Sequence, residues 1–222
     1  MRELAVDWLG TVPYVEGLEL QTKAVEARRA DAAPDRLLLL EHPPVITLGR
    51  SARREHLRVS PEALNDRGIG LHEISRGGDV TYHGPGQLVG YPILDLAARG
   101  EADLHRYLRS LEAVLVEALA TLGVSSRTLP GTTGVFAAAG PERSQRPRKI
   151  ASIGVGVRGW VTYHGFALNV TLDLAAFEVI VPCGLHDVEM TSVAAELGDA
   201  APAGLGERAT DAVADAFGRR WP

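Results

Sequence analysis

A single cysteine is present in the 222 residues, and its type and neighbours are suited to nucleophilic chemistry. It is Cys183, in the sequence Val-Pro-Cys-Gly-Leu at residues 181–185. A lone thiol cannot form an intramolecular disulfide or a multi-cysteine metal site, which leaves a buried packing residue or a reactive nucleophile. Pro182 and Gly184 interrupt regular structure, so we expect the thiol on a turn, where catalytic groups concentrate. A cysteine chosen blind would more often be a small buried hydrophobe, but other residues of this chain favour the nucleophile.

A lysine is the second candidate. The chain has two lysines, Lys23 and Lys149, against many arginines, and Lys149 opens an apolar run. A lysine at the edge of a strand is usually a solvated charge. Lysine can nevertheless change its protonation state when it is partly desolvated, whereas arginine effectively cannot. A lysine in an arginine-rich chain therefore hints at acid–base chemistry.

A glycine-rich segment is the third candidate. Residues 76–87 read Arg-Gly-Gly-Asp-Val-Thr-Tyr-His-Gly-Pro-Gly-Gln. Glycines permit backbone conformations that turn N–H groups toward a ligand. The segment lacks the lysine and serine or threonine that end a P-loop, and it is not the Gly-x-Gly-x-x-Gly pattern of dinucleotide-binding folds. His83 in isolation would be a core histidine by default, but within this loop we interpret it as part of a site.

Composition limits the classes of protein. The chain is 45% hydrophobic and 23% charged with a net charge of −5, which is typical of a globular protein and argues against nucleic-acid binding. No apolar stretch approaches membrane-spanning length, the first residues lack a signal peptide pattern, and a free thiol suits the cytoplasm. Two basic clusters could steer an acidic partner or could be solvated loops: Arg50, Arg53, Arg54 and Arg58 form one, and Arg143, Arg146, Arg148 and Lys149 the other.

The elements that must position these residues follow from hydrophobic spacing and from helix and strand breakers. Strands are expected at residues 4–9, 36–41, 45–48, 69–74, 87–96, 150–157 and 160–170. Helices are expected at residues 14–29, 60–68, 103–122, 193–197 and 207–217. Pro92 predicts an edge or a bulge in its strand, and the polar residues 131–148 predict a mobile loop. Strands and helices mix without strict βαβ alternation, so we predict an α+β (mixed α/β) fold in one domain over residues 1–222.

Small residues share faces of the two strands expected to form a hairpin. They are Ser152, Gly154 and Gly156 on the first strand, and Gly165 and Ala167 on the second. Small residues in mid-strand often mark places where a ligand or another backbone approaches closely. The pattern fits an apolar groove for an acyl chain, and it fits a bulge or tight sheet packing about equally well.

Four segments together resemble the signature segments of lipoyl(octanoyl) transferases. They are residues 76–87, 149–154 (Lys-Ile-Ala-Ser-Ile-Gly), 164–169 (His-Gly-Phe-Ala-Leu-Asn) and 182–184 (Pro-Cys-Gly), in matching order and spacing. The match runs from about residue 41 to 193. Two places depart from the family pattern: Phe136 stands where we expect tryptophan, and residues 137–147 form an extended, poorly matched segment.

The resemblance implies an enzyme that moves an octanoyl or lipoyl group from acyl carrier protein to a specific lysine of a lipoyl domain. Such acceptors are the E2 subunits of 2-oxoacid dehydrogenases and the glycine cleavage H protein. It also implies the catalytic module shared with biotin protein ligases and lipoate ligases. The acyl group arrives on the phosphopantetheine arm of the carrier, so no cofactor, ATP or metal is expected.

Residue by residue, the resemblance makes Cys183 the acyl-thioester nucleophile and Lys149 the group that lowers the pKa of its thiol. His83 and His164 become candidates for orienting the acyl thioester or the acceptor lysine. The remaining matches are expected to bind substrate: Arg76, Gly77, Gly78, Asp79, Val80, Thr81, Tyr82, His83, Ser152, Ile153, Gly154, Gly165, Phe166 and Ala167.

Three other functions compete with this interpretation. An ATP-dependent lipoate or biotin ligase of the same fold would activate a free acid and needs no cysteine. A cysteine hydrolase would pair Cys183 with His83 or His164 and release the acyl group to water. A non-catalytic module would bind acylated carrier proteins without turnover.

Overall fold

The computed structural model describes residues 4–138, 146–184 and 187–222, with the side chain of Cys183 outside that description. The described strands form two sheets. The larger has the order β1 (Ala5–Thr11), β2 (Arg36–Glu41), β6 (Gln87–Ile93), β10 (Val161–Asn169), β9 (Arg148–Arg158), β8 (Val135–Ala137), β7 (Ser126–Arg127), with β11 (Glu189–Met190) beside β9. The smaller has the order β4 (Gly70–Glu73), β3 (Val45–Leu48), β5 (Val80–His83). The mixed α/β fold predicted from the sequence is confirmed.

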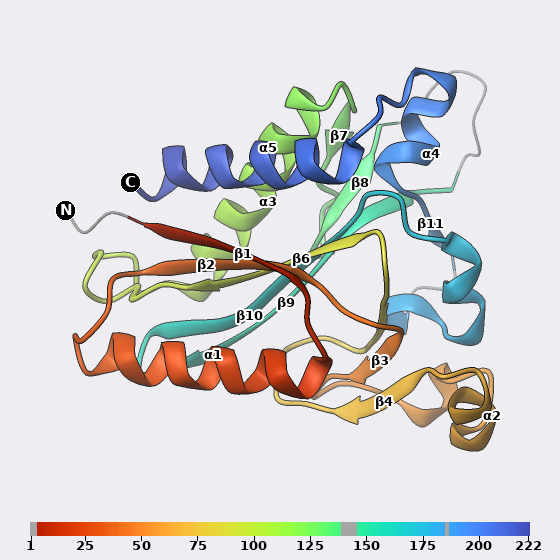
Figure 1. Ribbon diagram of the computed structural model, residues 1–222, viewed down its shortest axis with the longest axis horizontal. Coiled ribbons are helices and arrows are strands. Elements are labelled where there is room, and N and C mark those ends of the chain that lie inside the picture. Colours follow the sequence, from red (N-terminus) through yellow and green to blue (C-terminus); the bar gives the residue numbers. More distant parts are fainter. Residues whose placement is uncertain (1–3, 139–145, 185–186) are drawn as a thin grey trace.

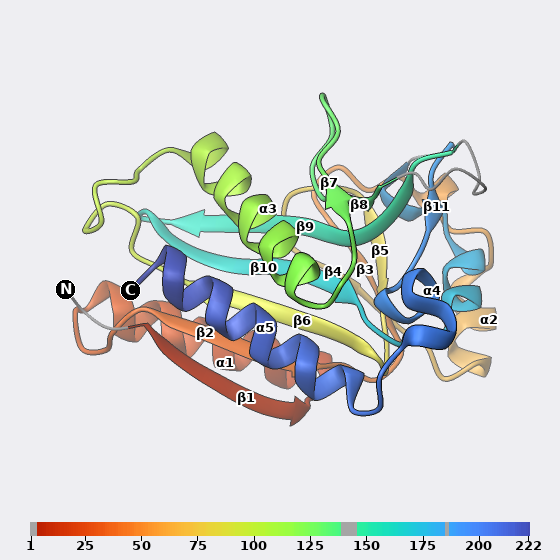
Figure 2. The same cartoon turned by 90° about the horizontal axis from the view of Figure 1, so that it is seen from above.

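Helices cover both faces of the larger sheet (Figure 1). Helix α1 (Tyr14–Arg29) lies on one face, and α3 (Leu104–Thr121) and α5 (Leu205–Arg220) lie side by side across the other (Figure 2). The smaller sheet and α2 (Pro61–Asp66) lie beyond the N-terminal end of α1. The short helices α4 (Val193–Leu197), η1 (Arg54–His56), η2 (Leu174–Val179), η3 (Pro182–Gly184) and η4 (Gly198–Ala200) complete the described elements. None of the helices in the described residues is both long and apolar enough to cross a membrane.

Helix α3 shows how sequence fixes this layer. Asp103 caps its first turn by accepting a hydrogen bond from the Arg106 amide at 3.0 Å. The apolar residues that follow at spacings of three and four then face inward, and Leu111 and Leu115 are fully buried. Burial of each leucine side chain stabilises the fold by about 1.5–3 kcal/mol. Phe217 of α5 belongs to the same core, so both helices pack against one face of the large sheet.

Pro92 lies in the interior of the large sheet, so the expected edge position is wrong. The ladder between β6 and β10 reaches only to Gly90 opposite Phe166. Beyond it, the Thr162 hydroxyl donates to the Pro92 carbonyl at 2.6 Å and accepts from the Leu94 amide at 2.9 Å. This local break, which matches the bulge alternative more closely, accommodates a residue that has no N–H to donate.

Residues 131–148 are not one continuous loop, which corrects the prediction. Val135–Ala137 form the buried strand β8, and Arg148 already belongs to β9. The apolar run that begins at Val135 is too short for periodicity to reveal a strand. Arg148 is largely buried and pairs with Glu196 at 2.9 Å, so it is not a solvated loop charge. Arg143, of the same basic cluster, lies outside the described residues.

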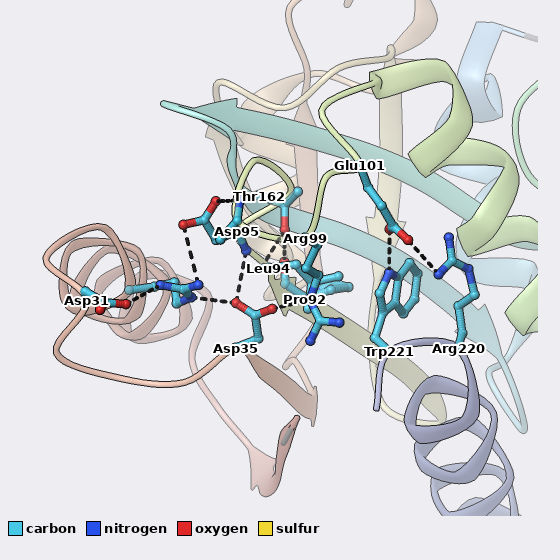
Figure 3. Close-up of polar contacts among 12 residues, drawn as sticks. Asp31, Asp35, Pro92, Leu94, Asp95, Arg99, Glu101, Thr162, Arg220 and Trp221 are labelled. Atoms are coloured by element: carbon cyan, nitrogen blue, oxygen red, sulfur yellow. Dashed lines mark hydrogen bonds and ion pairs between the residues drawn. The ribbon is translucent and has the colours of Figure 1, made fainter. Parts of the chain in front are cut away.

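A buried ion-pair cluster joins α1 to the start of β2 (Figure 3). The Asp35 carboxylate accepts hydrogen bonds from Arg28 Nε at 2.6 Å, from the Asp95 amide at 3.0 Å, and from Arg99. Arg28 also pairs with Asp31 at 3.1 Å and with Asp95 at 3.4 Å. Burial of Asp35 opposes its charged form, but these hydrogen bonds outweigh burial and hold the pKa of Asp35 below its ordinary value. The cluster therefore fixes the C-terminal half of α1 against the sheet.

Candidate active site

A cavity of about 230 Å³ lies where β5, β9 and β10 meet the segment before β8. Thirteen of the residues singled out from the sequence line it, although they come from segments far apart in the chain: Arg76, Gly78, Asp79, Thr81, His83, Lys149, Ser152, Ile153, Gly154, His164, Gly165, Phe166 and Ala167. The structure thus gathers the glycine-rich segment, the predicted hairpin and Lys149 around one space.

Three of the expected substrate-binding residues are not in the lining of this cavity. Side chains alternate along β5, so Thr81 and His83 face the cavity whereas Val80 and Tyr82 face the core of the smaller sheet. Gly77 contributes backbone, and its amide donates to the Val155 carbonyl at 2.9 Å. This bond attaches the glycine-rich segment to β9.

Other lining residues were not predicted. Tyr14 reaches the cavity from the start of α1, and Val89 and Tyr91 reach it from β6. Residues 131–133 close one side. Val89 and Tyr91 alternate with buried residues of the opposite face, so their shared face was available from the sequence; the contribution of Tyr14 depends on tertiary packing alone.

Lys149 is buried, with 3% of its surface exposed, and its side chain is held at the cavity. Its Nζ donates to the Thr133 carbonyl at 3.1 Å and lies 5.7 Å from the centre of the Phe136 ring. That ring is the phenylalanine found where the family pattern led us to expect tryptophan, and its face can attract a cation. Within this site, Lys149 is a positioned cation rather than a solvated one.

Cys183 lies in the single turn η3, which packs on β5. The next residue, Gly184, lies so close to Asp79 that a methyl group there would be 2.6 Å from Asp79 Oδ2. Asp79 itself lines the cavity. The backbone that carries the thiol therefore touches the wall of the cavity that contains Lys149.

Arg76 supplies a second buried cation. Its Nη2 donates to the Thr47 hydroxyl and to the Thr47 carbonyl, both at 2.8 Å, and its Nη1 donates to the Gly77 carbonyl at 3.1 Å. Burial, with contributions from His42, Arg76 and His164, lowers the pKa of His83 to about 3. Burial and Arg76 lower the pKa of His164 to about 4. Both imidazoles are therefore neutral near pH 7.

A chain of amides holds His83 in place. Gln87 Oε1 lies 2.7 Å from His83 Nδ1, and Gln87 Nε2 donates to Asn169 Oδ1 at 2.9 Å and to the Tyr82 carbonyl at 3.1 Å. Asn169 Nδ2 donates to the Thr191 carbonyl at 2.9 Å. Because these groups are buried and mutually bonded, the imidazole has a fixed orientation.

The sequence left open whether the small residues of the hairpin mark a ligand groove or tight packing of the sheet. A methyl group on Gly154 would lie 2.8 Å from the Gly77 carbonyl oxygen, and one on Gly165 would lie 2.2 Å from the Gly90 carbonyl oxygen. The close approach at these two glycines is made by the protein's own backbone. Ser152 and Ala167 do line the cavity.

The lining of the cavity contains both apolar side chains and a buried amine. Val89 and Ala167, which belong to one apolar cluster, offer hydrocarbon surface, whereas Lys149 lies on β9 five residues before Gly154. An apolar slot with a buried amine on its wall suits an acyl chain with a reactive carbonyl at one end. In the described residues no group of three or more histidine, cysteine, aspartate or glutamate side chains is placed to hold a metal ion.

The chain is similar in sequence to proteins of one known family. The model of the family "Lipoyl protein ligase A/B catalytic domain" matches residues 13–217, so the chain belongs to that family. It is 48% identical over 217 residues to an octanoyltransferase of Acidobacterium capsulatum, covering 95% of this chain and 87% of the relative. It is 50% identical over 196 residues to an octanoyltransferase of Geobacter metallireducens, covering 88% and 84%. These relatives confirm the resemblance to octanoyltransferases.

Solved structures share the fold at low sequence identity. A bipartite lipoate protein ligase of Thermoplasma acidophilum has a TM-score of 0.72 and 18% identity, covering 99% of this chain and 84% of its own. A lipoate-protein ligase A bound with ATP has a TM-score of 0.69 and 18% identity, covering 98% and 85%. The fold is therefore shared with ligases, and the chemistry must be argued from the site.

Proposed function

We propose that this octanoyltransferase works in two covalent steps through Cys183 and Lys149, taking its acyl group from acyl carrier protein. The main observation behind the proposal is that one cavity brings three features together. The buried amine of Lys149 and apolar side chains line it, and Asp79, another lining residue, contacts the turn that contains Cys183. Octanoyltransferases 45–51% identical to this chain support the acyl group assigned to it.

In the first step, the Cys183 thiolate attacks the carbonyl of the octanoyl thioester, because the thiolate rather than the thiol is the nucleophile. The nearby ammonium of Lys149 favours the thiolate electrostatically. The C–S bond to the carrier breaks, and the Lys149 ammonium gives its proton to the departing carrier thiolate, which leaves as the thiol. Octanoyl-Cys183 is the product of this step.

In the second step, an amine of the acceptor protein attacks octanoyl-Cys183 and forms an amide. Lys149, neutral after the first step, takes the proton that the amine loses, and the Cys183 thiolate leaves. The enzyme returns to its starting state. Both steps exchange one activated acyl bond for another bond, so the reaction requires neither ATP nor a metal ion.

The acceptor in this proposal is a lysine of a lipoyl domain, as in E2 subunits of 2-oxoacid dehydrogenases and the glycine cleavage H protein. Membership of the lipoyl protein ligase A/B family supports a protein acceptor of this kind. A catalytic thiol must stay reduced, which supports a reaction in the cytoplasm.

Intact-mass analysis tests the proposal directly. Purified protein mixed with octanoyl-carrier protein is expected to gain one octanoyl group on Cys183 and to lose it when a lipoyl domain is added. The variant Cys183→Ser, under the same conditions, is expected to pass no octanoyl group to the lipoyl domain. Acceptor modification that requires ATP and free octanoate would instead identify a ligase, and loss of the acyl group without an acceptor would identify a hydrolase.

A further inference from the structure

Gly184, which follows Cys183, rests on a hydrogen-bonded pair formed by His56 and Asp79. His56 Nδ1 and Asp79 Oδ2 lie 2.5 Å apart, and the two side chains are 10% and 13% exposed. A methyl group on Gly184 would lie 2.9 Å from His56 Cε1 and 2.6 Å from Asp79 Oδ2. Gly184 also has a φ of +66°, so no other residue fits this surface without displacing the pair.

The same two residues connect three segments of the chain. The Val181 amide donates to the His56 carbonyl at 2.8 Å, which ties the approach to Cys183 to η1. Asp79 Oδ1 accepts from the Val80 amide at 2.7 Å and from the Arg53 amide at 3.2 Å. Both oxygens of Asp79 are therefore engaged, and its orientation toward His56 is fixed.

Within the described residues, the turn that carries Cys183 has one internal backbone hydrogen bond. It is closed by the Gly184 amide, which donates to the Val181 carbonyl at 3.1 Å. Pro182 has no N–H to contribute. Backbone bonds hold the chain up to Val181, and beyond it Gly184 packs on the His56–Asp79 pair, so this pair contributes to the position of the turn relative to the cavity.

We propose that His56 and Asp79 form a positioning pair that holds the Cys183 turn at the cavity containing Lys149. The pair acts through the turn and not on the reacting atoms. This inference rests on the proposed function of Cys183. Displacement of a reacting group by about 1 Å can slow a reaction by about 100-fold, so the orientation of one histidine can matter at a site that it does not enter.

Three variants separate the hydrogen bond from simple packing. His56→Phe keeps a ring but has no donor for Asp79, whereas His56→Asn places an N–H donor near the position of Nδ1. We expect His56→Phe to form the acyl-enzyme about 10- to 100-fold more slowly, with KM for octanoyl-carrier protein within about twofold of wild type. We expect His56→Asn to recover most of the rate. His105→Phe, at an exposed histidine of α3, is the matched control and should react at the wild-type rate.

A double-mutant cycle tests whether the two residues act as a unit. Asp79→Ala and His56→Phe should be non-additive, so that the double variant is no slower than the slower single one. Wild-type acylation by folded His56→Phe, equal slowing by phenylalanine and asparagine, or fully additive effects would each overturn the proposal. Thermal unfolding identifies variants that lose structure, and folded Asp79→Asn, expected to be slower than wild type, then replaces Asp79→Ala.

The test also distinguishes this inference from the function on which it rests. If the wild-type protein forms no octanoyl-enzyme, the proposed two-step reaction is refuted, independently of the results with the His56 variants. Alkylation of the lone cysteine by iodoacetamide needs no acyl donor and still compares wild type with His56→Phe. A changed alkylation rate supports positioning of the turn, and an unchanged rate overturns it.

Discussion

The Cα of Gly134 lies against the side chain of Lys149, so closely that a methyl group there would be 2.8 Å from Lys149 Cε and 3.3 Å from Nζ. The Gly134 amide donates to Glu112 at 2.9 Å, which fixes the backbone at this approach. Gly134 also has a φ of +123°, where residues with side chains are strained. The absence of a side chain at Gly134, the residue before β8, thus leaves the space that the Lys149 side chain occupies at the site.

Gly134→Ala is therefore expected to displace Lys149 and to slow acyl-enzyme formation by about 100-fold, the cost of misplacing a reacting group by about 1 Å. Intact-mass time courses with octanoyl-carrier protein measure this rate. Gly218→Ala in α5, where a methyl group meets nothing within 4 Å, is the control and should react normally. Equal rates for both variants would show that Lys149 needs no such space.

Lys149→Met should keep the fold and lose the chemistry. The methionine stem can occupy the buried space over Phe136, but it supplies neither a positive charge nor a proton. General acid–base catalysis contributes about 10²- to 10⁴-fold, and acyl transfer should fall within that range. Lys23→Met removes the other lysine of the chain, which is exposed on α1, and should leave turnover unchanged. Retained transfer by folded Lys149→Met would exclude the proposed role.

Buried neutral histidines should make the protein less stable in mild acid. The pKa of His83 is lowered to about 3 and that of His164 to about 4, whereas an unfolded chain binds protons near pH 6.5. Below pH 6.5 the unfolded state therefore holds more protons, and the free energy of unfolding falls as the pH drops toward 4. Each histidine contributes at most about 1.4 kcal/mol per pH unit. Urea unfolding at pH 7 and pH 5 measures the slope, which should shrink in His83→Gln; an identical slope would contradict this account.

Asp35→Ala should destabilise the fold far more than Asp31→Ala, although both residues pair with Arg28. Removing Asp35 leaves the charge of Arg28 buried without its main partner, which costs about 3–5 kcal/mol. Asp31 is 63% exposed, and its loss should cost about 1 kcal/mol or less. Urea unfolding at pH 7 compares the two variants. Similar losses would mean that the remaining aspartates compensate for Asp35.

The sequence predicted the family and most residues of the cavity better than it predicted how they are arranged. The glycine-rich segment, Lys149 and the residues of the hairpin identified most of the cavity wall, because local composition alone singled them out. The helix at residues 14–29 was predicted at its observed bounds, since it begins after a proline and ends with basic residues.

What the sequence could not reveal depends on contacts between distant segments. His56 was not singled out from the sequence, and its bond to Asp79 exists only because the fold brings η1 beside the residue that precedes β5. Val80 and Tyr82 were grouped with their neighbours, yet strand alternation sends them into the core of the smaller sheet. Tyr14 reaches the cavity only because the N-terminal end of α1 packs there.

The amide chain that ends at Thr191 has a direction, and that direction decides where His83 carries its proton. The Thr191 carbonyl can only accept, so Asn169 must present its oxygen to Gln87, and Gln87 must present its oxygen to His83. The proton of the neutral imidazole then lies on Nδ1, and Nε2 shows a lone pair to the Thr47 hydroxyl, 3.4 Å away. The Thr191 carbonyl, at the other end of this series of hydrogen bonds, thus selects the Nδ1-protonated tautomer of His83. In that tautomer His83 cannot donate a proton through Nε2.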